Sequence, residues 1–139
     1  MQRILGIDVG EARIGLALSD ELGMLAHPLE TVTVREGDPL QRIGAVVERE
    51  SISTIIIGLP RNMDGSYGPA AQKVRLFADQ LKTRIPGISC RFWDERLTTV
   101  AAQKQLHAAG KNTKQSRSII DQAAAVLILQ GYLDSLGNV

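Results

Sequence analysis

The stretch that decides the fold is STIIIGLP, residues 53–60, in which three consecutive isoleucines precede Gly58. A strand with apolar residues at successive positions presents them to both of its faces. Both faces are covered only in the middle of a sheet that has helices on each side. The stretch therefore predicts a central parallel strand in an α/β protein.

The runs around this strand give the order of the elements. Short turns join strand-like runs at 3–9, 13–20 and 24–34, which predicts an antiparallel meander with Pro28 on its edge strand. Apolar spacing and turn signals predict helices over 38–51 (with Asp38 as cap and Pro39 first), 69–85, 98–110 and 119–136, a strand over 88–93, and a basic loop over 111–118. We expect one α/β domain, residues 1–139, with a mixed five-stranded sheet: three antiparallel strands, then two βα units, flanked by helices.

Composition sets few limits on the partners. The 139-residue chain carries a formal net charge of +1, so any basic surface for nucleic acid has to be local. The single cysteine, Cys90, excludes an intramolecular disulfide, and its apolar neighbours predict a buried small side chain. Asp8 interrupts the first apolar run before a signal peptide can form, and no run reaches the ~20 residues of a membrane span. We expect a cytoplasmic protein without membrane contact.

Acids follow two of the predicted strands at the edge where α/β sheets carry their sites. Asp8 ends the first strand, and Asp94 and Glu95 end the fifth. If the fourth strand lies between these two, Gly58 leaves a pocket between the acids. Carboxylate ligands in such a gap suit Mg²⁺ or Mn²⁺, which can promote phosphodiester hydrolysis.

A third acid, Asp121, is the only charged residue between Arg117 and Asp134. It lies one turn into the predicted apolar final helix, where an acid is rarely buried without a partner. Two interpretations stay open: an acid near a helix N-terminus that the helix dipole favours, or a third member of the metal site.

Basic residues near these acids are candidate phosphate contacts. They are Arg13, Arg61, Arg96, Lys111, Lys114 and Arg117, and the segment GKNTKQSR, residues 110–117, concentrates positive charge just before Asp121. Gly6, Gly10 and Gly15 surround Asp8 in the first hairpin. Their small size predicts either tight packing and a turn that needs a positive φ, or close approach of a phosphate to the backbone.

Four segments together resemble the YqgF family, also called RuvX, nearly from end to end: GIDVGEARIGLALSD, IIIGLPRNMDGSYGP, DERLTTVAA and IIDQAAAVLILQGYL. The resemblance implies a compact ribonuclease H-like fold. It implies metal-binding, catalytic acids at Asp8, Glu95 and Asp121, with Asp94 able to replace or assist Glu95. Asn62, Arg96 and Thr98 would be supporting residues near the substrate. Glu11 stands where the family commonly has a basic residue.

Three functions follow as hypotheses. The first is a metal-dependent nuclease, a hydrolase acting on ester bonds, that matures the 5′ end of precursor 16S ribosomal RNA; this is what the resemblance implies. The second is a Holliday junction resolvase, which would need a dimer on four-way DNA, whereas the nuclease could be a monomer or a homodimer. The third is a non-catalytic RNA-binding factor in ribosome assembly, for which carboxylates that repel phosphate would be unfavourable.

Overall fold

The computed structural model describes residues 3–62, 64–95 and 114–137, and for residues 114–119 it describes the backbone. Within these ranges the strands form one sheet in the order β3-β2-β1-β4-β5. The elements are β1 (Arg3–Val9), β2 (Arg13–Ser19), β3 (Ala26–Thr33), a 3₁₀ turn (Val34–Glu36), α1 (Pro39–Arg49), β4 (Ile52–Leu59), α2 (Pro69–Arg84), β5 (Ser89–Asp94) and α4 (Lys114–Gly137). The pairs β1–β2 and β2–β3 are antiparallel, and the pairs β1–β4 and β4–β5 are parallel. The predicted mixed five-stranded sheet is confirmed.

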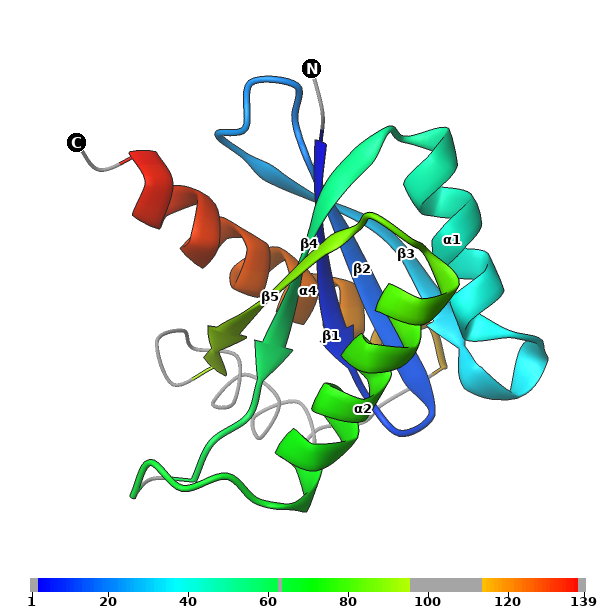
Figure 1. The fold of residues 1–139 in the computed structure, drawn as a ribbon, viewed down its shortest axis with the longest axis vertical. Coiled ribbons are helices and arrows are strands. Elements are labelled where there is room, and N and C mark those ends of the chain that lie inside the picture. Colours follow the sequence, from blue (N-terminus) through cyan, green and yellow to red (C-terminus); the bar gives the residue numbers. More distant parts are fainter. Residues whose placement is uncertain (1–2, 63, 96–113, 138–139) are drawn as a thin grey trace.

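The central strand β4 is buried on both faces, as its sequence predicted. Ile55, Ile56 and Ile57 each have 0% of their surface exposed. Figure 1 shows why: α4 crosses one face of the sheet, and α1 and α2 lie on the other. Side chains of successive β4 residues point to opposite faces, so both helical layers need an apolar partner from this strand.

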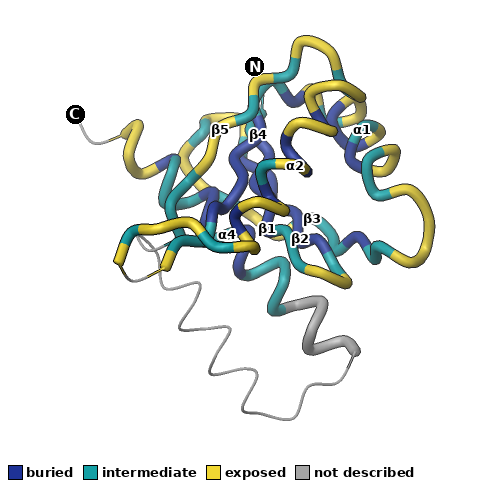
Figure 2. The backbone as a smooth tube through the Cα atoms, turned by 60° about the horizontal axis from the view of Figure 1, so that its bottom comes forward, coloured by how far each residue is buried: buried dark blue, intermediate teal, exposed yellow. Residues whose placement is uncertain are grey.

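The sheet separates two apolar cores, and its strands form the buried centre of the molecule (Figure 2). The larger core lies under α1 and α2, and the smaller one lies under α4. Buried members of the smaller core are Ala17, Ile56, Ala124, Ala125, Ile128, Leu129 and Leu133. Leu136, further along α4, is 56% exposed, so burial of α4 ends near Leu133.

Helix α4 packs unusually close to the sheet because small residues meet at the contact. A Cβ atom at Gly6 would stand 2.6 Å from the Leu129 Cβ and 3.0 Å from the Ala125 carbonyl oxygen. Two glutamines also join the helix to the edge of the sheet. Gln122 Nε2 donates to Thr31 Oγ1 at 3.1 Å, and Gln130 Oε1 accepts from the Ala26 amide at 2.9 Å.

Two local signals in the sequence are confirmed. Pro28 lies on the edge strand β3, at a register irregularity where a missing amide hydrogen does not interrupt the ladder. Asp38 caps α1: its Oδ1 accepts from the amides of Leu40 at 3.1 Å and Gln41 at 3.4 Å. Pro39 is the first helical residue, where its lack of an amide hydrogen loses no bond.

The start of α4 differs from the prediction. The helix begins at Lys114, so residues 114–118 are helical and the basic loop expected over 111–118 is wrong for this part. Lys, Gln and Arg are good helix formers, and no Gly or Pro interrupts this segment, so its polarity alone did not indicate a loop. The expected helix over 98–110 and residues 111–113 lie outside the described residues.

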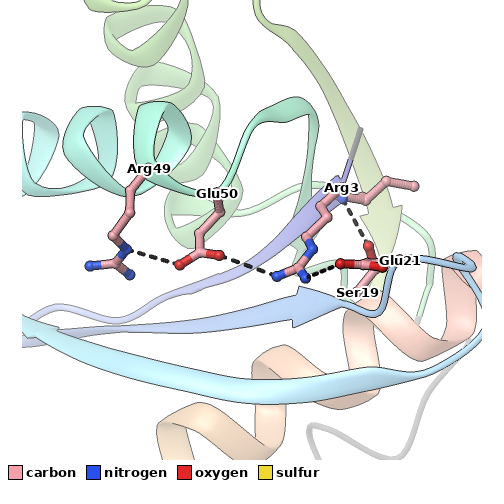
Figure 3. A network of polar contacts seen from close by, with 6 residues as sticks. Arg3, Ser19, Glu21, Arg49 and Glu50 are labelled. Atoms are coloured by element: carbon pink, nitrogen blue, oxygen red, sulfur yellow. Dashed lines mark hydrogen bonds and ion pairs between the residues drawn. The ribbon is translucent and has the colours of Figure 1, made fainter. Parts of the chain in front are cut away.

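Ion pairs tie the beginning of β1 to its neighbours (Figure 3). The Arg3 guanidinium donates to Glu50 Oε1 at 3.2 Å and to Glu21 Oε1 at 3.3 Å, and Arg49 Nε contacts Glu50 Oε2 at 2.9 Å. We call these four residues the amino-end network. It fixes β1 against the end of α1 and the β2–β3 turn.

Among the described helices, none combines the length and the apolar character needed to cross a membrane.

Candidate active site

Asp8 is a buried carboxylate near the end of β1, with only 2% of its surface exposed. It pairs with Gly15 of β2, and the preceding pair between Ile7 and Ile57 places Gly58 of β4 on its other side. Because side chains alternate along a strand, Asp8 shares the face of Gly6, which α4 covers. Burial of a carboxylate costs free energy unless hydrogen bonds or a cation compensate it. Asp8 is therefore the strongest single candidate for a functional acid.

Asp121 reaches this region because Gly15 has no side chain. A Cβ atom at Gly15 would collide with the main-chain carbonyl oxygen of Asp121. Asp121 thus lies directly over the β2 residue that pairs with Asp8. It follows Lys114 by seven residues, so it is two turns inside α4 and outside the first turn. The interpretation as an acid favoured by the helix N-terminus is therefore wrong.

The first-hairpin glycines serve packing between protein segments. Neither Gly6, Gly10 nor Gly15 is among the described residues with a positive φ, so the expected need for that conformation is wrong. At Gly10 a Cβ atom would stand 2.5 Å from the Arg13 carbonyl oxygen, to which the Gly10 amide donates at 2.9 Å. Gly10 and Gly15 therefore allow other backbone segments of the protein to come close to the hairpin.

Arg13 and Asp121 form an ion pair, although they are 108 positions apart in the sequence. Arg13 Nε lies 2.7 Å from Asp121 Oδ2, and the two side chains are 30% and 14% exposed. Sequence reasoning gave Arg13 a phosphate and Asp121 a metal ion. The structure brings the two side chains together. Asp121 lies over Gly15, the β2 residue that pairs with Asp8.

The two consecutive acids after β5 point to opposite faces of the sheet. Asp94 pairs with Leu59 in the ladder and accepts from Arg61 Nη1 at 3.2 Å. Glu95 instead lies over Gly58, where its Oε1 would be 2.8 Å from a Cβ atom on that glycine. Glu95 is consequently the acid that shares a face with Asp8.

The pocket expected at Gly58 is wrong. Ile128 of α4 fills the space together with the Glu95 carboxylate, so a Cβ atom at Gly58 would collide with Ile128 Cδ1. The apolar side chain enters because α4 packs closer than an average helix. Because Gly58 has no side chain, both Ile128 of α4 and the Glu95 carboxylate can lie close to β4 at this position.

The three acids surround the same two glycines, Gly15 and Gly58, but they do not converge into one cluster. Over residues 3–62, 64–95 and 114–137, no group of three or more His, Cys, Asp and Glu residues could hold a metal ion as it stands. The contact between Asp121 and Arg13 accounts for part of this spread. The donor set itself is entirely carboxylate oxygen, the ligand type that Mg²⁺ and Mn²⁺ prefer.

The predicted substrate contacts divide into two groups. Asn62 is described: its Nδ2 donates to Ser66 Oγ at 2.9 Å, and its backbone bonds Ser66 and Gly65, so it shapes the β4–α2 loop. Lys114 and Arg117 belong to the first turns of α4. Arg96, Thr98 and Lys111 lie outside the described residues.

Sequence reasoning missed a ring contact in the β4–α2 loop. The Arg61 and Arg75 guanidinium carbons lie 4.6 and 4.3 Å from the centroid of the Tyr67 ring. We call these three residues the arginine–tyrosine stack. The sequence signal was weak, because Arg75 stands inside a helix and nothing in its spacing indicates a loop aromatic as partner.

Two further features lie on the side of the sheet that α1 and α2 cover, away from the three acids. A hollow of about 700 Å³ lies between the β1–β2 turn and the starts of α1 and α2, and its lining includes Val9, Glu11, Leu40 and Phe77. Cys90, predicted to be buried, is only partly buried against the larger core, because it lies on the edge strand β5, and this burial raises the pKa of its thiol.

Comparison of folds first defines the class. The structure resembles Thermus thermophilus RuvC in complex with a Holliday junction substrate, with a TM-score of 0.55 and 16% identity over 99% of this chain and 97% of that one. At this identity the likeness shows the fold alone, which is ribonuclease H-like, as expected from the sequence.

The sequence then defines the family. The model described as "RuvX: Holliday junction resolvase" matches residues 2–135, and the chain belongs to this family. A relative from Acetivibrio thermocellus named "Putative pre-16S rRNA nuclease" is 49% identical and covers 99% of both chains. A Bacillus subtilis relative with the same name is 43% identical over 96% of this chain and 99% of its own length.

Proposed function

We propose that this protein is a metal-dependent nuclease that hydrolyses phosphodiester bonds and matures the 5′ end of precursor 16S ribosomal RNA in the cytoplasm. Membership of the RuvX family and the names of its full-length relatives support the proposal. The observation that carries it is the burial of Asp8, 2% exposed, on the face where Glu95 lies over the neighbouring Gly58. Burying a carboxylate costs free energy, so a buried acid with a second acid over the neighbouring strand residue fits a site that holds a cation better than a core that serves packing alone.

In this proposal Asp8 and Glu95 hold the metal, and Asp121 is the third ligand. Asp94 is set aside because it faces the other side of the sheet and binds Arg61. Bound Mg²⁺ or Mn²⁺ would supply an activated water and a counter-charge for the leaving oxygen. Arg13 neutralises the charge of the Asp121 carboxylate through their 2.7 Å contact. Asn62, Arg96, Thr98, Lys111, Lys114 and Arg117 remain the proposed contacts to the substrate.

The test compares wild-type protein with Asp8→Asn on three substrates: a precursor 16S 5′ fragment, an unstructured single strand and a four-way DNA junction. Each is incubated with Mg²⁺ or Mn²⁺. Loss of a metal ligand should slow cleavage of the precursor by more than about 100-fold, since even outer-shell changes cost 10–100-fold. Glu50→Gln, in the amino-end network, is the matched control and should cleave as wild type does. Equal rates for wild type and Asp8→Asn would refute the site.

A junction resolvase is the second candidate, favoured by the family description and by the fold shared with RuvC. A resolvase cuts two strands related by a two-fold axis, so it needs a dimer. A monomer in sedimentation, with preference for the RNA fragment, would exclude it. The third candidate, a non-catalytic RNA-binding factor, predicts RNA binding without cleavage and no Mn²⁺ binding in calorimetry.

A further inference from the structure

The arginine–tyrosine stack offers a cation without a carboxylate partner at the carboxyl end of the sheet. Tyr67 is 41% exposed, and the guanidinium carbons of Arg61 and Arg75 lie 4.6 and 4.3 Å from its ring centroid. Two like charges against one ring are stable only if something compensates them, because each attracts the ring but repels the other cation. The positive charges of Arg61 and Arg75 are balanced by the rest of the protein to different extents.

Arg61 is fully engaged by the protein. Its Nε donates to the Gly65 carbonyl oxygen at 3.0 Å, its Nη2 donates to the same oxygen, and its Nη1 lies 3.2 Å from Asp94 Oδ2. The side chain is 26% exposed. Arg61 therefore joins the loop to the end of β5 and fixes the ring of Tyr67 from below. Its charge is balanced by Asp94.

For Arg75, the described part of the chain shows no carboxylate that balances the positive charge. Within the described residues, none of the ion pairs involves Arg75, and its only contact of this kind is with the Tyr67 ring. The Arg75 guanidinium carbon lies over the Tyr67 ring, and a guanidinium presents its N–H donors as a planar fork. Such a fork fits two oxygens of a phosphate.

The stack is connected to the proposed catalytic acids through the backbone of β5. Arg61 binds Asp94, and the next residue is Glu95, whose carboxylate lies over Gly58 beside Asp8. An anion bound at Arg75 would therefore lie at the same end of the sheet as the acids.

We infer that Arg75, stacked on Tyr67, binds a phosphate of the RNA strand at this end of the sheet, on the face opposite the acids, and that Arg61 is the positioning residue of this contact. The inference rests on the proposed nuclease function and names where its substrate is held. RNA is favoured over DNA because the full-length relatives are named for an RNA substrate. The phosphodiester is common to both, so the experiment separates them.

The experiment measures binding of a 5′-labelled single-stranded RNA by fluorescence anisotropy, without divalent metal, over a series of KCl concentrations. For Arg75→Ala we expect a Kd roughly tenfold higher, since a hydrogen-bonded charge contact is lost. The slope of log Kd against log salt should fall by about 1. Lys82→Ala removes an equal charge from an exposed position of the same helix and should bind as wild type does. Equal Kd and slope for the two variants would overturn the inference, as would wild-type protein that does not bind RNA.

Variants of Tyr67 test the stack apart from the charge. Tyr67→Phe keeps the ring and should bind like wild type, whereas Tyr67→Leu should raise the Kd several-fold because the Arg75 fork loses its support. Equal binding by Tyr67→Leu and Tyr67→Phe would overturn the role of the ring. Melting temperatures of all variants exclude a general loss of folding.

Two further arms separate this inference from the proposed function. Asp8→Asn should not weaken RNA binding in the absence of metal, because it removes a negative charge that repels phosphate; if Asp8→Asn also cleaves normally, the nuclease site is wrong while the Arg75 contact stands. Normal RNA binding by Arg75→Ala, with cleavage lost in Asp8→Asn, would overturn the contact alone. A four-way DNA junction forms the last arm. An Arg75→Ala loss confined to the junction would overturn the assignment to RNA.

Discussion

The two ends of β1 carry charges that are handled in opposite ways. At its start, Arg3 meets Glu21 and Glu50 on the surface, and the three side chains are 28%, 77% and 21% exposed. Near its end, Asp8 is 2% exposed, and the adjacent strand residues on the α4 face are Gly15 and Gly58. The seven-residue strand β1 thus has a surface ion-pair network at its start (Figure 3) and a buried carboxylate near its end.

The difference is what the proposed function predicts for charges that hold the fold and charges that bind a metal. Exposed ion pairs cost little to form and stabilise little, so the amino-end network holds β1 in place without strong constraint. A buried carboxylate opposes folding unless it is compensated, and a second acid beside it makes this worse. The carboxyl end therefore has the composition of a site, and predictions that separate the two ends test that interpretation.

The largest effect on stability is expected at the carboxyl end, from Gly15→Ala. The new Cβ would meet the carbonyl oxygen of Asp121, which belongs to helix backbone and cannot rotate away. We expect the free energy of unfolding to fall by about 1–3 kcal/mol, the usual cost of overpacking. Precursor cleavage should fall as well, because α4 carries Asp121 away from Asp8. Urea denaturation and a cleavage assay measure the two effects.

Gly44→Ala is the control for that change. Gly44 lies in α1, and a Cβ atom there would have Ile85 Cγ1 as a neighbour at an ordinary 3.9 Å. Alanine should therefore raise the free energy of unfolding by about 0.5–1 kcal/mol through its helix propensity. If both alanines changed stability in the same direction, the close contact of α4 with Gly15 would not be a real constraint.

The next effect concerns metal binding, and it compares Arg13 with Arg3. Arg13→Ala removes a cation that contacts Asp121 at 2.7 Å, whereas Arg3→Ala removes one from the other end of the sheet. With less positive charge near the acids, the Kd for Mn²⁺ should fall several-fold in Arg13→Ala and stay unchanged in Arg3→Ala. Isothermal calorimetry measures both. Weaker Mn²⁺ binding in Arg13→Ala would mean that the arginine is needed to place Asp121, against this prediction.

Much of the fold could be predicted from the sequence because its signals are local. Three isoleucines in β4 indicated burial on both faces, Pro28 indicated an edge strand, and the Asp38–Pro39 pair indicated the start of α1; all three are confirmed. The order of the elements then allowed few arrangements of the sheet. The start of α4 was misplaced because its polar residues are compatible with both a loop and a helix.

The candidate site could be predicted less completely because it depends on contacts between distant residues. Strand ends indicated Asp8 and the Asp94–Glu95 pair as candidates, and the structure places Asp8 and Glu95 on the face that α4 covers; their role as metal ligands stays a prediction. That Ile128 fills the space at Gly58, and that Arg13 binds Asp121, follows from how closely α4 packs against the sheet. The spacing of residues along the sequence does not indicate how closely a helix packs against a strand.

A small effect is expected from the amino-end network. Arg3→Ala breaks two ion pairs at once, but Glu21 is 77% exposed and both pairs are open to salt. The free energy of unfolding should fall by less than about 1 kcal/mol, and the difference from wild type should shrink further in molar salt. Urea denaturation at low and high salt measures this. A salt-independent loss of several times that size would place Arg3 in the core rather than on the surface.

The smallest effect concerns an acid that lies near the same end of β1 as Asp8 but is exposed. Asp38 lines the hollow beside Val9 and Gly10. Its hydrogen bond from Arg84, and those from the Gln41 and Leu40 amides, hold its pKa below the usual 3.8. The folded state thus favours the charged form.

The sign of the pH dependence follows from that lowered pKa. The stabilisation by Asp38 is complete above the unfolded pKa near 3.8 and is lost as the pH falls through the lower folded value. Asp38→Asn keeps a capping oxygen but removes the charge. Its melting temperature should lie slightly below that of wild type at neutral pH, and the two should converge as the pH falls below 3.8 in calorimetric scans. A difference that persisted unchanged in acid would assign the effect to cap geometry, leaving charge without a stabilising role even at this exposed acid.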